Sequence, residues 1–500
     1  MTAWLDRVTG RVTMYRLVTL LLVVTGLAAL VLSLVGELFY TPLELVASAA
    51  VALASTIVAN RVFALVFRTM PHLESSIITG LLLFFLFLPS LDPAELGTLA
   101  LAGVLATASK YLIAVRGRHI LNPAAAGATL VAVLQLPSAG WWVATGPLLP
   151  VALVGAFLVL YRTRRLGMGL VFVAVSASIL IVRLTAAGQG VAEAVSTTFA
   201  SYPIIFFVGF MLSEPLTMAP RRWQQLAIAA LVGVLFTVPF TIGPVFLSFE
   251  FALVLGNILA FLAGQRRGIR LSFLGRRQLT PTSWEFRFQP ESPVAFRAGQ
   301  YMELTVPHPR ADARGSRRVF TIASPPTTDG PVAFALRMSE PGSSFKQALL
   351  GLQPGARVRG TSVGGDFLLP RDVSAPVLLI ASGIGITPFV SQLQRDRAAG
   401  VDRDAVLIYT IRGVEDLAFR AELGEERVLL VCPTQPDNLP ATWRWIGAGP
   451  LSTELLGIEV PDLAARTAFV SGSPSSIARA RAALRGAGVR RVRTDHFTGY

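Results

Sequence analysis

The chain contains very little cysteine and histidine, and its acidic residues are outnumbered by basic ones. Among 500 residues there are one cysteine, Cys432, and four histidines, and 30 acidic residues stand against 44 basic ones. A single cysteine excludes a disulfide framework, a cysteine-ligated iron-sulfur cluster and a cysteine-type zinc site. We therefore expect a protein with no bound metal, whose one thiol is a buried strand residue rather than a nucleophile.

Charged residues are also scarce, and their scarcity is uneven. The composition is 53% hydrophobic and 15% charged. Long apolar runs recur up to about residue 264, after which Arg, Asp, Glu and Pro become frequent. The first apolar run, Leu17 to Val35, is too long for the core of a signal peptide and no cleavage site follows it. Residues 1–264 are therefore predicted to form a polytopic membrane domain within the lipid bilayer.

Ten apolar stretches have roughly the length that a bilayer requires. Basic residues gather in alternate loops, whereas the loops 90–95, 138–140 and 241–243 have none. This alternation predicts that both termini and everything after residue 264 are cytoplasmic in a multi-pass protein of the cell membrane. The stretches are centred near residues 26, 51, 82, 105, 129, 152, 177, 209, 233 and 254.

The basic loops also explain much of the net charge of +14. Binding of nucleic acid would require a basic cluster away from the membrane flanks, so no such partner is expected. A pair of membrane haems would require four axial histidines, and the first 264 residues contain only His72 and His119. Haem is therefore not expected either.

A glycine turn in the second half indicates a nucleotide site. Residues 377–380 form an apolar run typical of a buried strand, and Gly383 and Gly385 follow it. A helix is predicted from about Pro388, preceded by Thr387, so that its free N–H groups face whatever lies on the glycines. The arrangement suits a pyrophosphate, although a Gly-x-Gly turn alone is a weak signal.

Six further strings accompany this turn, and in their order and spacing they resemble the ferredoxin-NADP reductase superfamily over about residues 268–500. The resemblance implies an antiparallel β-barrel FAD domain over 265–372 and an α/β parallel-sheet nicotinamide domain over 373–500. The strings are Gln300-Tyr301-Met302-Glu303-Leu304, Arg317-Arg318-Val319-Phe320-Thr321-Ile322-Ala323-Ser324-Pro325, Gly342-Ser343-Ser344-Phe345, Gly365-Asp366-Phe367, Ser471-Gly472-Ser473-Pro474 and Asp495-His496-Phe497-Thr498-Gly499-Tyr500.

The family's flavin signature, Arg-x-Tyr-Ser/Thr, here reads Arg318-Val319-Phe320-Thr321, with Phe in place of Tyr. A guanidinium pairs well with a diphosphate, an aromatic ring can lie along a flavin, and a hydroxyl can bond its N5 edge. The resemblance accordingly implies that Arg318 binds the FAD phosphate, Phe320 the ring and Thr321 the N5 region. It assigns the other side of the phosphate to Gly342, Ser343 and Ser344.

The nicotinamide site departs from the family at one position. Ser471 stands where the family's Cys-Gly-x-Pro element has cysteine, followed by Gly472, so slower turnover is expected but not loss of the site. A terminal aromatic covers the flavin in plant-type relatives; Tyr500 and Phe497 both qualify, and both also suit a packed strand. Arg412 either holds a 2′-phosphate or contacts the adenosine, so NADH and NADPH both remain open.

Two strings in the apolar half resemble a second family. His119-Ile120-Leu121-Asn122-Pro123-Ala124 and Phe210-Met211-Leu212-Ser213-Glu214-Pro215-Leu216-Thr217 are similar to elements of the flavin-carrying membrane subunits of the Rnf and sodium-pumping NADH:quinone reductase complexes. That resemblance implies an inverted repeat of five plus five helices and a second flavin, FMN or riboflavin, near Asn122, Glu214 and Thr217. The alternative is two proline-marked helix starts at the membrane surface.

The second flavin is expected to be non-covalent, because the family's Ser-Gly-Ala-Thr attachment string is lacking. Glu250 is expected well inside the tenth span, either on a proton path or in a structural contact. Together the strings predict a membrane-bound NAD(P)H oxidoreductase that passes electrons through FAD to a membrane flavin, a quinone or a redox protein, with transfer across the membrane as an extension. The alternative is a solute or ion transporter with a redox-sensing flavin domain.

Overall fold

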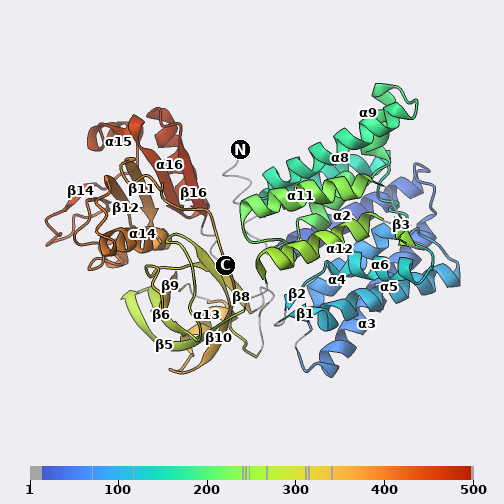
Figure 1. The fold of residues 1–500 in the computed structure, drawn as a ribbon, viewed down its shortest axis with the longest axis horizontal. Helices are drawn as coiled ribbons and strands as arrows, with labels where there is room; N and C mark the ends of the chain where they lie inside the picture. Colours follow the sequence, from blue (N-terminus) through green and yellow to red (C-terminus); the bar gives the residue numbers. More distant parts are fainter. Residues whose placement is uncertain are drawn as a thin grey trace. The chain divides into compact units, whose positions relative to one another are not determined.

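The computed structural model describes residues 14–69, 71–115, 118–238, 241–242, 245–246, 248–265, 268–309, 312, 316–338 and 342–496. Contacts divide the chain into two compact units, with the division after residue 266. The first is helical and the second contains both large sheets (Figure 1). Phe497 and Tyr500, the two candidates for the aromatic that covers the flavin, lie outside the described residues.

Several helices of the helical unit begin at proline or at a capping side chain. Thr41, Asp92 and Asn122 each cap a helix whose first residue is proline, an arrangement that satisfies the free N–H groups of the first turn. The helices are α2 (Met14–Leu34), α3 (Pro42–Val66), α4 (Leu73–Leu86), α5 (Pro93–Leu112), α6 (Pro123–Val133), α7 (Leu149–Arg162), α8 (Leu166–Ala186), α9 (Val191–Ala200), α10 (Ile204–Phe206), α11 (Arg222–Thr237) and α12 (Phe249–Ala260), with π-helical turns at Phe207–Leu212 and Phe261–Gln265.

Each of the ten predicted span centres falls within one of these helical segments, and α9 is an additional helix that was not predicted. In the described part of the chain, three helices are long and apolar enough to cross a bilayer: α2, α3 and α8. The pair formed by α9 and Ile204–Leu212, bent by 48°, is a fourth if it counts as one broken span. Helices such as α4, α6 and α12 are shorter than the roughly 20 residues that a span requires. Ten spans and an inverted repeat therefore stay predictions.

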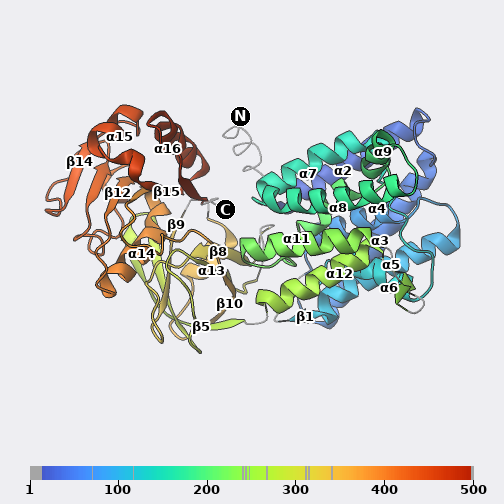
Figure 2. The same cartoon turned by 45° about the horizontal axis from the view of Figure 1, so that its top comes forward.

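The helices pack around one large apolar core, in which α8, α11 and α12 lie side by side (Figures 1 and 2). The expected position of Glu250 was wrong: it lies in the first turn of α12, because that helix begins at Phe249. Its side chain is fully buried, and Trp141 Nε1 donates to one of its carboxylate oxygens at 3.0 Å. Among the described residues the other oxygen has no hydrogen-bond partner.

The second unit begins with a six-stranded antiparallel sheet in the order β8-β7-β10-β5-β6-β9. A bridge between Ile322 and Phe334 joins the end of β8 to β9, so the two outer strands of the sheet meet. Its interior holds buried aromatic and aliphatic side chains, and the helix α13 (Ser344–Leu350) packs against them. The strands are β5 (Ile269–Thr280), β6 (Ser283–Pro290), β7 (Tyr301–Thr305), β8 (Arg317–Thr321), β9 (Val332–Arg337) and β10 (Arg357–Gly364).

The last part of the chain forms a parallel sheet in the order β14-β13-β12-β11-β15-β16. One face carries α14 (Thr387–Ala398) and the other carries α15 (Thr453–Glu459) and α16 (Pro474–Gly486) (Figure 1). The order of the strands reverses between β11 and β15, which is where doubly wound sheets bind ligands at their carboxyl ends. The strands are β11 (Val377–Ser382), β12 (Ala405–Thr410), β13 (Val428–Val431), β14 (Trp443–Gly447), β15 (Thr467–Gly472) and β16 (Val492–His496).

Candidate functional site

The predicted glycine turn lies at the reversal point of the parallel sheet. Gly383 follows β11 with a φ of 54°, in the left-handed region that glycine adopts without strain. A Cβ on Gly385 would lie 2.6 Å from the carbonyl oxygen of Ser471 and 2.7 Å from Cα of Gly472. The turn therefore packs directly on the end of β15, and only glycine fits there. Thr387 and Pro388 then begin α14, as the sequence indicated.

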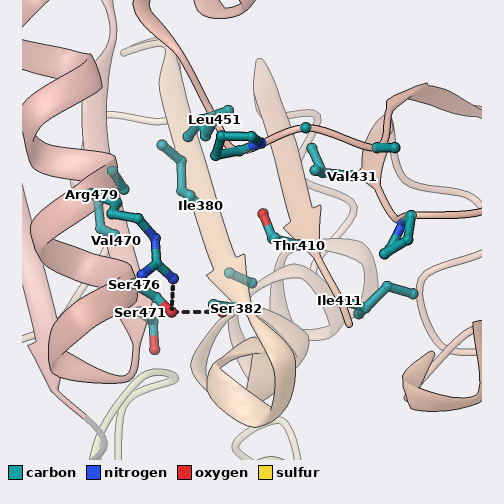
Figure 3. A pocket seen from close by; sticks show the side chains of 16 residues that line it. Ile380, Ser382, Thr410, Ile411, Val431, Leu451, Val470, Ser471, Ser476 and Arg479 are labelled. Carbon is teal, nitrogen blue, oxygen red and sulfur yellow. Dashed lines mark hydrogen bonds between the residues drawn. The ribbon is translucent and has the colours of Figure 1, made fainter. Parts of the chain in front are cut away.

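Beside this turn, a cavity of about 280 Å³ opens across the carboxyl ends of four strands (Figure 3). Ser471 lines it and is 1% exposed, and its hydroxyl has no hydrogen-bond partner among the described residues. A buried polar group without a partner is costly, which points to a ligand that completes it. Ser471, the residue predicted to contact the nicotinamide, thus has a hydroxyl available for a ligand at the expected edge of the sheet.

Two cavity residues, Ser476 and Arg479 on α16, were not predicted. Ser382 donates to the Ser476 hydroxyl at 3.1 Å, and Arg479 donates to the same oxygen at 3.4 Å (Figure 3). An arginine on a helix with other surface arginines carries no sequence signal of its own. Arg412, predicted to contact the nucleotide, follows β12 but is not among the residues that line the cavity.

The predicted flavin residues lie on β8 and at the start of α13. Thr321 is buried, whereas Val319 is 55% exposed on the same strand. The half-buried ring of Phe320 packs at 5.8 Å from that of Phe345 and 6.5 Å from that of Phe334. The Arg318 guanidinium lies 5.3 Å from the centre of the Phe345 ring, a cation–π distance. The strand thus presents a guanidinium group and a hydroxyl group that are both largely buried.

The start of α13 already binds an anionic group. The backbone N–H of Ser344 donates to Asp312 Oδ2 at 3.1 Å, and Arg318 lies 3.7 Å from Asp312 Oδ1. Ser343 caps the helix by accepting from the N–H of Lys346, and Gly342 precedes it. A carboxylate is thus held by the same groups that the flavin signature assigns to a diphosphate, so their geometry suits an oxyanion.

Hydrogen bonds join the two lobes of this unit beside both sites. Ser391 in α14 donates to the carbonyl of Ser324, three residues after Thr321, at 2.7 Å. The adjacent Gln392 donates to the carbonyl of Phe367 at 2.7 Å. Both donors are fully buried. The helix that begins at the glycine turn is therefore fixed against the strand that carries the flavin signature.

A separate polar cluster lies in the helical unit, where the two proline-containing strings meet. Asn122 donates from its amide to one carboxylate oxygen of Glu214 at 2.9 Å, and His119 lies 2.9 Å from the other. Thr217 is at the edge of the cluster, with its hydroxyl 3.5 Å from Glu214. The backbone N–H of Asn122 donates to Asn257 on α12 at 2.7 Å. His119 and Asn257 complete the cluster but were not predicted as members.

The sequence can be compared with those of known proteins. No family model matches the sequence. The chain is 31% identical over 219 residues to an aromatic O-demethylase reductase subunit from Amycolatopsis, covering 41% of this chain and 62% of that protein. It is 33% identical over 160 residues to ferredoxin–NADP reductase B from Sorangium cellulosum, covering 30% and 64%. The chain therefore spans less than two thirds of the length of either relative.

Two further matches are similar in extent. The ferredoxin reductase component of a 3-ketosteroid-9-alpha-monooxygenase from Mycolicibacterium smegmatis is 29% identical over 197 residues, covering 39% of this chain and 53% of that protein. Among solved structures, a cytochrome P450 reductase from Amycolatopsis matches with a TM-score of 0.39 and 28% identity, covering 46% of this chain and 70% of that one. All three sequence relatives are reductases or reductase components.

Proposed function

We propose that the whole chain is a membrane-bound NAD(P)H oxidoreductase. The premise is that the C-terminal part of the chain is an oxidoreductase domain of the ferredoxin-NADP reductase type. Electrons pass from NAD(P)H through FAD to an acceptor held in the helical unit or in the bilayer. The acceptor is a second flavin or a quinone, and a redox protein is the alternative that the relatives' partners suggest. Transfer across the membrane is an extension of the same proposal.

The hydrogen bond between Ser391 and Ser324 carries this proposal. Hydride transfer requires the nicotinamide and the flavin to be held in a fixed geometry, with the reacting atoms about 3 to 3.5 Å apart. The bond ties the helix after the glycine turn to the segment that follows β8, which supports a fixed spacing between the two predicted binding sites. When bound, FAD accepts a two-electron hydride and passes the electrons on one at a time.

The chain's own residues bind and orient the two ligands. Arg318 and the start of α13 suit the FAD diphosphate, since they already hold the carboxylate of Asp312. Gly383 and Gly385 let the backbone approach the dinucleotide at the 3₁₀ turn Gly383–Ile386, which leads directly into α14. The open hydroxyl of Ser471 is assigned to the nicotinamide end.

The cluster around Glu214 is proposed as the site of the membrane acceptor. Its carboxylate, amide and imidazole groups offer both hydrogen-bond donors and acceptors beside the capped start of α6. The alternation of basic loops supports a multi-pass protein of the plasma membrane with both termini and the reductase unit in the cytoplasm.

The test is a cofactor analysis of the full chain purified in detergent. We expect an optical spectrum of flavin without haem bands, extraction of FAD with or without a second flavin, and bleaching on anaerobic addition of NADH or NADPH. A preparation that contains FAD but is bleached by neither nucleotide would refute the oxidoreductase proposal. Substrate flux through proteoliposomes with no reducible chromophore would favour the transporter.

A further inference from the structure

The nucleotide cavity is unevenly charged. Among the described residues that line it, Arg479 is the one charged side chain, and no carboxylate accompanies it. The remaining lining side chains are hydroxyl-bearing or apolar. An arginine that faces a cavity without a neighbouring acid can form charge-assisted hydrogen bonds with a ligand oxyanion. The cavity is therefore suited to an anionic group at one particular position.

That position is at the reversal point of the sheet, not over its β12–β13 side. Arg479 reaches toward Ser476 and Ser382, which lie beside β15 and at the end of β11 (Figure 3). Thr410 and Val431 lie on the other side of β11, at the ends of β12 and β13 (Figure 3). No charged residue among those described lines that other side of the cavity.

In a doubly wound sheet a dinucleotide crosses the carboxyl ends of the strands, with its pyrophosphate at the reversal point. We infer that Arg479 and the hydroxyl of Ser476, both on α16, bind the pyrophosphate of the dinucleotide together with the hydroxyl of Ser382, which directly precedes the glycine turn. The adenosine then lies over β12 and β13, where the lining is uncharged. This inference rests on the proposed function.

A pyrophosphate ligand has a distinctive consequence for nucleotide choice. NADH and NADPH share the pyrophosphate and differ only in the 2′-phosphate on the adenosine. Arg479 therefore contributes equally to both nucleotides, and the lining of the adenosine end gives a 2′-phosphate no cationic partner. Arg412 follows the lining residue Ile411 in sequence but does not itself line the cavity. It is the neighbouring cation that could distinguish NADPH from NADH.

The experiment uses the full chain with Arg479→Ala, and with Arg481→Ala as the matched control. Arg481 is exposed on the same helix and does not line the cavity. The measurements are the KM for NADH and for NADPH in dye reduction, and the Kd of ADP-ribose by calorimetry. Losing a charge-assisted bond should raise both KM values and the Kd by the same factor, about 10- to 100-fold. Arg479→Lys should restore part of the loss, and the control should match the parent protein.

Three outcomes would overturn the inference: a rise confined to NADPH, which makes Arg479 a 2′-phosphate ligand; no change in any constant; and an equal effect of Arg481→Ala. The proposed function fails in a different way. If the parent protein binds ADP-ribose and loses that binding in Arg479→Ala, while neither nucleotide reduces its flavin, the phosphate site stands and the oxidoreductase assignment falls.

Discussion

The hydroxyl of Ser391 donates a 2.7 Å hydrogen bond to the carbonyl oxygen of Ser324, and this bond joins α14 to the segment that follows β8. Ser391 lies in the second turn of α14, and Ser324 lies just beyond β8. Because α14 begins at a predicted binding residue and β8 ends at another, a small shift at this bond would change the separation of the two ligands.

Ser391→Ala should slow flavin reduction by NAD(P)H about two- to tenfold, because a buried hydrogen bond contributes roughly 0.5 to 1.5 kcal/mol to the aligned junction. Stopped-flow absorbance at saturating nucleotide measures the rate, and extraction measures FAD content, which should be unchanged. Ser374→Ala, at an exposed turn, is the control. An unaltered rate in Ser391→Ala would show that the bond does not set the geometry.

Arg318→Ala should empty the flavin site and leave the helical unit folded. Truncating one partner of a close charge pair costs about 2 to 5 kcal/mol, enough to lose FAD during purification. The measurement is the ratio of flavin to protein, and Arg359→Ala, on an exposed position of β10, provides the comparison. If the Arg318→Ala variant retained stoichiometric FAD, Arg318 would not be a ligand of the diphosphate.

The parts of the reductase unit that could be predicted from sequence are those whose chemistry is local. The turn at Gly383 and Gly385 and the string at Arg318 are continuous segments, so residue type and order were enough to place them. Ser476 and Arg479 were missed for the opposite reason. They reach the cavity only because α16 packs on this edge of the sheet, where Ser476 meets Ser382, a residue 94 positions away in sequence.

Replacing Asn122 and Glu214 together by Ala should slow electron transfer to the membrane acceptor and leave reduction of a soluble dye unchanged. The pair holds the cluster together through the 2.9 Å bond between their side chains. Glu214→Gln tests the charge alone, since it preserves the shape and the cap of α6. The measurement compares, in one preparation, the rate at which a water-soluble dye is reduced with the rate at which a quinone is reduced.

Glu193→Gln, at an exposed carboxylate on α9, is the control for these variants. If quinone and dye are both reduced at parental rates, the cluster is structural and the helical unit is an anchor or a transporter.

The sequence marked both strings but could not show that they meet, because the contact joins residues 92 positions apart. Nor could it mark Asn257, an isolated amide within an apolar helix.

Stability at acidic pH should depend on Asp462. The guanidinium of Arg466, which is hydrogen-bonded to its carboxylate at 3.0 Å, holds the pKa of Asp462 below its ordinary value of 3.8. A depressed pKa contributes stability that is complete above the ordinary value and is lost as the pH falls through the folded pKa. Since Asp462 is about half exposed, the contribution should be below about 1 kcal/mol.

Asp462→Asn should therefore lower the free energy of unfolding near neutral pH and flatten its decline below about pH 4. Urea titrations of the full chain, followed by tryptophan fluorescence at several pH values, measure this difference. Asp402→Asn, at an exposed residue before β12, should leave the curve unchanged. A parallel curve for Asp462→Asn, lowered equally at every pH, would contradict the pKa argument.

The single thiol of this chain is hidden. Cys432 is fully buried after β13, and serine replaces cysteine at position 471. Maleimides and similar alkylating reagents therefore have no accessible target in the folded reductase unit. A cysteine introduced at an exposed site in each unit would be labelled selectively, so pairs of spin or fluorescent probes can report the distance between the two units during turnover without first removing a native thiol.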